Sequence, residues 1–141
     1  MPARRSPDGD VWFVQFPEGE DLHQAYRGFA REQGLASGVV LAGIGMLRDP
    51  VLGFYDGQRY HQRALDGMFE LVSTQGNIAL LDGAPFTHLH VTVAGADHVA
   101  RGGHLFGGKV CISHEGAVRA LPDVPLRRAR LPGTELAALV D

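Results

Sequence analysis

The segment Phe86-Thr87-His88-Leu89-His90-Val91-Thr92-Val93 is the most informative part of this chain. Its β-branched residues and its alternating pattern predict a β-strand, on which residues two apart point to the same side. His88 and His90 therefore lie on one side of that strand, with Cα atoms about 6.6 Å apart from the usual rise per residue. At that spacing both imidazoles can reach one ion at the usual Zn–N distance of about 2.0–2.1 Å.

A third imidazole, that of His104, follows fourteen residues after His90. The turn-forming residues 94–97 and the pair Gly102-Gly103 predict that the chain doubles back and places His104 beside the other two. Three histidines without a fourth protein ligand leave one coordination position for water or a substrate. The alternative is that each histidine is a half-buried polar residue with its own hydrogen bond, because the chain contains 7 histidines and some pairs fall two apart by chance.

Composition indicates one globular domain in a reducing compartment. The chain has 141 residues, of which 45% are hydrophobic and 21% charged, and no apolar run is long enough for a membrane span. We predict a flexible segment at 1–9, without the apolar core of a signal peptide, followed by a single domain at 10–141. The lone Cys111 cannot form an internal disulfide, which favours the cytoplasm.

The charge distribution argues against nonspecific binding of nucleic acid. The formal net charge is −3, whereas DNA-binding domains usually carry a basic excess or a basic stripe. The nearest approach to a basic cluster is formed by Arg127, Arg128 and Arg130. We interpret these arginines as solvent-facing residues that protect an edge strand, with a phosphate clamp as the alternative.

The remaining pattern predicts an α+β fold. Apolar residues at helical spacing predict a helix at 20–33, which Gly34 ends. Residues 39–47 are apolar throughout, as in a strand that is covered on both faces. Hairpin signals separate a long series of strands, so we predict a mainly antiparallel sheet with one N-terminal helix packed on it. The other predicted strands are 11–16, 51–55, 59–65, 68–74, 78–81, 86–93, 109–113, 118–121 and 126–131, with turns at 49–50 and 75–77.

Glu70 is the candidate catalytic residue outside the histidines. It lies in the middle of a predicted strand, where a buried carboxylate needs a partner. Glu70 could orient a ligating histidine or accept a proton from bound water, and the alternative is a cross-strand salt bridge to an arginine. His114 is a further candidate for the same site. His23 is interpreted as a surface or packing residue, and His61 and His98 as surface residues.

A series of short motifs in fixed order gives the chain a family likeness. The motifs are Gly43-Ile44-Gly45, Val51-Leu52-Gly53-Phe54-Tyr55-Asp56, Gly67-Met68-Phe69-Glu70-Leu71-Val72-Ser73, Gly76-Asn77, Asp82-Gly83, Phe86-Thr87-His88-Leu89-His90-Val91 and Gly103-His104-Leu105. In these motifs the chain resembles the plants-and-prokaryotes-conserved domain (PPC, formerly domain of unknown function 296) over residues 10–131. This resemblance implies an α+β homotrimer with a zinc site formed by His88, His90 and His104.

Two departures from the plant members concern partners. The Arg-Gly-Arg-Pro AT-hook of those members is absent, so we expect little or no direct binding to DNA. Met68 replaces the arginine of their Gly-Arg-Phe-Glu-Ile-Leu segment, which weakens the expectation of the same protein partner. The resemblance therefore implies a stand-alone cytoplasmic homotrimer with a divalent-metal site and a DNA-associated or regulatory role. The alternative is a hydrolase or lyase that uses metal-activated water at this site, with Glu70 or His114 handling protons.

Overall fold

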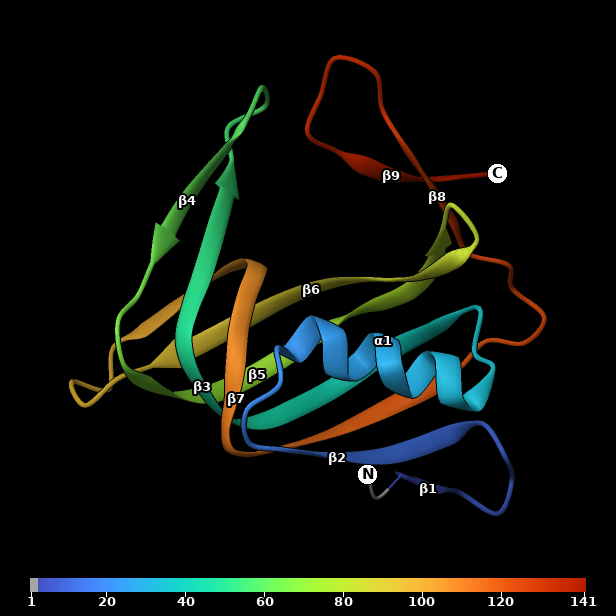
Figure 1. The fold of residues 1–141 in the computed structure, drawn as a ribbon, viewed down its shortest axis with the longest axis horizontal. Coiled ribbons are helices and arrows are strands. Elements are labelled where there is room, and N and C mark those ends of the chain that lie inside the picture. Colours follow the sequence, from blue (N-terminus) through green and yellow to red (C-terminus); the bar gives the residue numbers. More distant parts are fainter. Residues whose placement is uncertain (1–2) are drawn as a thin grey trace.

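The computed structural model describes residues 3–141, which contain one α-helix and a nine-stranded sheet (Figure 1). No helix in this part of the chain is long and apolar enough to cross a membrane. The elements in chain order are β1 (Ala3–Arg5), β2 (Val11–Pro17), α1 (Leu22–Gln33), β3 (Gly38–Tyr55), β4 (Tyr60–Ala64), β5 (Met68–Leu81), β6 (Ala84–Ala94), β7 (Ala100–Ala120), β8 (Arg127–Arg130) and β9 (Ala137–Val140).

Helix α1 begins and ends at residues suited to those positions. The Asp21 side chain accepts a hydrogen bond from the Gln24 backbone N–H, and Gly34 ends the helix in the left-handed conformation, with φ of 64°. The predicted apolar stripe is confirmed, since it packs into the core against the sheet. The buried residues of the helix are Leu22, His23, Ala25, Tyr26, Phe29 and Ala30.

The strand pairings confirm the α+β class with a mainly antiparallel sheet. The order is β1-β2-β7-β3-β5-β8-β9, and among the strands of residues 3–141 only the short β5–β8 pairing is parallel. Strand β6 pairs with both β5 and β7, which also both pair with β3, so these four strands form a closed ring of pairings. Helix α1 lies across this sheet, and the β3–β4 hairpin and the loop before β9 rise beyond it (Figure 1).

Three predicted turns are wrong, because their residues lie inside continuous strands that pair with their neighbours. The segment 75–77 lies inside the continuous strand β5, where a Cβ at Gly76 would meet the His88 backbone oxygen at 1.9 Å. Asp49 and Pro50 lie inside β3, where its register with β7 shifts. Gly102 and Gly103 pair with β6 within the 21-residue strand β7.

The structure differs from two further expectations, which concern strand β3 and the N-terminal segment. Strand β3 is not covered on both faces, since Leu41 and Ile44 of its apolar segment are exposed. Ala3–Arg5, within the segment 1–9 predicted to be flexible, form β1 and pair with β2. The first two residues of that segment lie outside the described part of the chain.

Candidate metal centre

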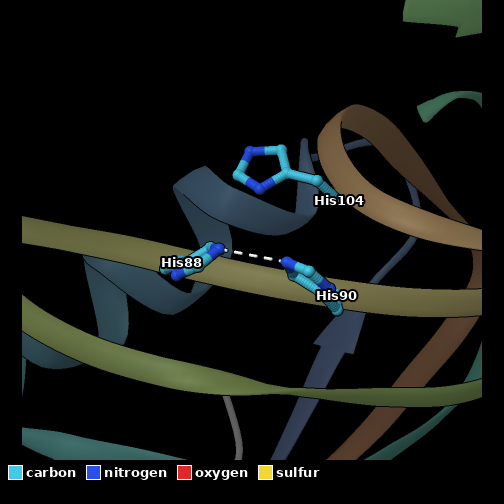
Figure 2. Close-up of side chains that lie close together, drawn as sticks. All are labelled: His88, His90 and His104. Carbon is cyan, nitrogen blue, oxygen red and sulfur yellow. Dashed lines mark hydrogen bonds between the residues drawn. The ribbon is translucent and has the colours of Figure 1, made fainter. Parts of the chain in front are cut away.

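The structure brings His88, His90 and His104 together, as predicted. One ring nitrogen from each histidine lies within 4.8 Å of the others. The Nε2 atoms of His88 and His90 are 3.1 Å apart, and the three rings face a common space (Figure 2). Nitrogens that share a tetrahedral zinc ion lie about 3.4 Å apart when each bond is about 2.05 Å. The pair on β6 is therefore already at ligand spacing, and His104 needs only a small approach.

Strand geometry explains why the three rings converge. His88 and His90 alternate with the buried Thr87 and Leu89, so both project from the same side of β6. His104 is the direct cross-strand partner of His90 on the neighbouring strand β7. Cross-strand partners and next-but-one residues are the nearest neighbours on one face of a sheet, which is the basis of the cluster.

Aromatic side chains support the third histidine. The rings of Tyr60 and Phe106 lie 4.9 and 4.7 Å from the His104 ring, measured between centroids. The backbone of Gly53 pairs with His104 on the other edge of β7, where a Cβ at Gly53 would meet the Phe106 ring at 2.2 Å. Glycine at position 53 therefore allows Phe106 to pack beside His104.

The electrostatics favour neutral imidazoles. Burial, followed by the charge of Arg128, lowers the pKa of His88 to about 4. Burial, followed by the neighbouring His88 and His90, lowers the pKa of His104 to about 4. Both rings are therefore uncharged at neutral pH, which is the form that binds a metal ion.

The donor set fits a divalent metal ion that accepts nitrogen ligands. The Nδ1 atom of His104 is buried and has no hydrogen-bond partner within residues 3–141. An imidazole nitrogen without a partner beside two further imidazoles is explained if the group is a ligand set, because buried polar atoms otherwise find partners. One contact opposes coordination through Nε2 of His88, since Arg128 Nη2 donates to its Nδ1 at 3.3 Å. Coordination at Nε2 moves the ring proton to Nδ1 and requires Arg128 to turn aside.

His23, interpreted as a surface or packing residue, is buried and links α1 to the site. Its Nδ1 lies 2.7 Å from Thr87 Oγ1, and its Nε2 lies 2.7 Å from the Leu105 backbone oxygen. Because a carbonyl only accepts, Nε2 carries the proton and Nδ1 accepts from Thr87. Each partner is the sequence neighbour of a cluster histidine, so His23 fixes β6 and β7 relative to each other behind the cluster.

The other candidate residues lie elsewhere. Glu70 is exposed on β5 and pairs with Ala94, whereas the β5 residue opposite His90 is Gln75, five positions along the strand. The structure thus does not bring Glu70 to the histidines, and no ion pair to it forms within residues 3–141. His114 also stays away from the cluster, because it is buried against Tyr26 at 2.7 Å.

The two remaining histidines are on the surface, as interpreted. His61 is exposed and contacts the Asp56 carboxylate. His98 is exposed between β6 and β7.

A cavity of about 490 Å³ adjoins the cluster. His88 and His104 form part of its wall, together with the start of α1 and the segment that leads into β9. Sequence patterns did not identify Arg27 and Arg128 as part of this wall. Arg128 was interpreted as solvent-facing, yet it is half-buried and contacts His88. The signal available was its position in β8 next to the exposed Arg127, because neighbouring residues of a strand point to opposite sides.

Comparison with known proteins gives a family and several solved relatives. The Plants and Prokaryotes Conserved (PCC) domain model matches residues 3–121. The chain is 36% identical over 110 residues to the bifunctional protein GlmU of a Synechococcus strain, covering 78% of this chain but only 16% of that protein.

Three crystal structures share the fold. A plant- and prokaryote-conserved protein of Pyrococcus horikoshii is 30% identical, with a TM-score of 0.83 over 94% of each chain. A metal-containing protein of Archaeoglobus fulgidus is 29% identical, with a TM-score of 0.84 over 94% of each chain. A protein of Ralstonia eutropha JMP134 named "putative DNA-binding protein" is 26% identical, with a TM-score of 0.83 over 98% of this chain and 94% of that one.

Proposed function

Because the chain belongs to the PCC domain family, we propose that it is a homotrimeric metalloprotein that holds a divalent ion, zinc first, on His88, His90 and His104. The observation that carries this proposal is the convergence of three imidazole nitrogens within 4.8 Å. The relative from Archaeoglobus fulgidus that is named metal-containing supports it. Nitrogen ligands alone favour zinc or another late first-row metal over magnesium or calcium.

Metal content tests the site. Untagged protein is expected to carry one zinc per chain by elemental analysis, and His90→Ala is expected to carry none. His61→Ala is the matched control, because His61 is an exposed histidine outside the cluster. Equal zinc in wild type and His90→Ala would show that the metal, if any, is held elsewhere.

An exposed apolar face supports the trimer. Ile44, Val72 and Ile112 are 56%, 52% and 67% exposed, and they line one shallow depression together. Ile112 also has a φ of 65°, which is strained for a β-branched residue. A face of this kind is costly in water, and closed rotational symmetry buries it. We therefore assign this Ile44 face, with Glu70 at its rim, to the contact between copies of the chain.

The biological role that we propose is regulatory and acts through protein partners. The relative named "putative DNA-binding protein" supports an association with DNA. The net charge of −3 argues that such an association is indirect, since direct binding to phosphates needs a basic surface. Ternary complexes of the trimer, a protein partner and DNA are the expected form.

A second candidate, a metal-dependent hydrolase or lyase, is favoured by the cavity beside the cluster. A divalent ion on the histidines supplies a Lewis acid for such chemistry. The chain itself contributes the cavity wall and the carboxylates of Asp21 and Glu135, which line this cavity where Glu70 does not. Hydrolysis of a panel of carboxylic esters is the test. Activity that survives both chelation and His90→Ala would show that the hydrolysis does not take place at the histidine site.

A further inference from the structure

The cavity beside the histidine cluster contains two arginines without an ion-pair partner among residues 3–141. The guanidinium groups of Arg27 and Arg128 lie over the ring of Phe86, at 5.0 and 5.9 Å from its centroid. Two carboxylates, of Asp21 and Glu135, also line the cavity, but both already accept hydrogen bonds from backbone N–H groups. The formal charges of the two arginines and the two carboxylates cancel, so the wall offers a ligand hydrogen-bond donors rather than a net positive charge.

The two arginines differ in the donors that they offer. Arg27 donates from Nε to Thr87 Oγ1 at 3.1 Å, and its two Nη atoms make no hydrogen bond to the described residues. Both Nη atoms of Arg128 are already engaged. Nη1 donates to the Ala137 backbone oxygen at 2.6 Å, and Nη2 donates to Asn77 Oδ1 at 3.0 Å and to His88 Nδ1 at 3.3 Å. Arg27 thus presents a free pair of donors at its Nη atoms. Burial lowers the pKa of both guanidinium groups, and at Arg27 the nearby charge of Asp21 opposes this effect.

Several other residues of the wall are apolar or aromatic. Tyr60, Phe86 and Phe106 line the cavity together with Leu105 and Leu136. A volume of about 490 Å³ suits a small organic molecule rather than an inorganic ion or a polymer. Flat apolar walls beside a guanidinium fork fit a molecule with a hydrophobic body and one anionic end.

We infer that this cavity binds a small monocarboxylate with an aromatic or short aliphatic body, whose carboxylate accepts hydrogen bonds from the Nη atoms of Arg27. The planar fork of arginine matches the two oxygens of a carboxylate. A phosphate dianion fits less well, because Asp21 and Glu135 lie on the same wall. This inference deepens the proposed function. It rests on that function only because the proposed metal ion would lie at the edge of the same cavity.

Titration of the full chain followed by NMR tests the assignment. The probes are benzoate, phenylacetate and hexanoate, with benzamide as the neutral analogue of benzoate and phenyl phosphate as the dianion. At least one monocarboxylate is expected to bind, and benzamide is expected to bind about tenfold or more weakly, as for loss of charge-assisted hydrogen bonds. Arg27→Gln is expected to weaken carboxylate binding about tenfold or more, and Arg27→Lys by less.

The control is Arg31→Gln, one turn along the same helix and exposed, which is expected to leave binding unchanged. Thermal unfolding of each variant shows whether it is folded. Equal binding of benzoate and benzamide, unchanged binding in folded Arg27→Gln, preference for phenyl phosphate, or no binding of any carboxylate would each overturn the inference. Zinc content is measured on the same samples, so carboxylate binding without zinc refutes only the metal site, and zinc without carboxylate binding refutes only this inference.

Discussion

Lowering the pH is expected to weaken the anchor between α1 and the sheet, because that anchor contains a buried neutral histidine. His114 is fully buried, lies 2.7 Å from the Tyr26 hydroxyl and stacks on Phe16. Burial lowers its pKa from 6.5 to about 4. Since the unfolded chain binds this proton near pH 6.5 and the folded chain does not, stability is complete above that pH and falls as the pH drops toward 4.

The magnitude follows from the two pKa values. One pH unit between them corresponds to about 1.4 kcal/mol, so His114 alone is expected to lower the free energy of unfolding by about 2.5 kcal/mol between pH 8 and pH 4.5. Urea denaturation of metal-free protein at one fixed concentration measures this loss. His114→Gln keeps an oxygen that can accept from Tyr26 and does not titrate, so its loss should be smaller by about that amount.

The comparison with His114→Gln isolates one group, because the two proteins share every other side chain. His61→Gln is the control and should lose as much stability as wild type, since His61 is exposed. The same loss in His114→Gln as in wild type would refute the reasoning. It would mean that the buried imidazole contributes nothing to the acid sensitivity of the fold.

Other predictions concern the helix, the trimer and DNA. Gly28→Ala is expected to raise the free energy of unfolding by about 0.5–1 kcal/mol in the same denaturation assay, because a Cβ there meets nothing closer than Arg31 Nη2 at 3.8 Å. Ile112→Asp is expected to convert trimers to monomers by light scattering, whereas Val124→Asp, an exposed residue outside the Ile44 face, should leave the mass unchanged. The isolated chain is expected to show no binding to an AT-rich duplex at about 150 mM salt, and tight, strongly salt-dependent binding would contradict this.

Local patterns predicted what depends on one strand or one helix. The alternation around His88 and His90 was enough to place both rings on one side of β6, and the stripe around Tyr26 and Phe29 was enough to define the buried face of α1. The prediction that His104 joins the pair was confirmed for a different reason. It reaches the pair as the cross-strand partner of His90 in a long strand, not through a turn at Gly102 and Gly103.

Features that depend on distant segments could not be predicted in this way. Gly76 looks like a turn residue in the sequence, but it is required where β5 and β6 approach each other. The cavity depends on Arg27 of α1 and Arg128 of β8, which are 101 positions apart and both lie over the ring of Phe86 only in the folded chain. The interpretation of Arg128 as solvent-facing did not include that contact. The position of Glu70 away from the cluster likewise follows from the register of β5 with β6.

Anomalous scattering from a crystal of the zinc-loaded protein, measured on both sides of the zinc absorption edge, tests the central claim most directly. The account predicts one anomalous peak per chain between the rings of His88, His90 and His104, with each Zn–N distance about 2.0–2.1 Å. A peak on other residues, or fully zinc-saturated protein with no peak among these three rings, would contradict it.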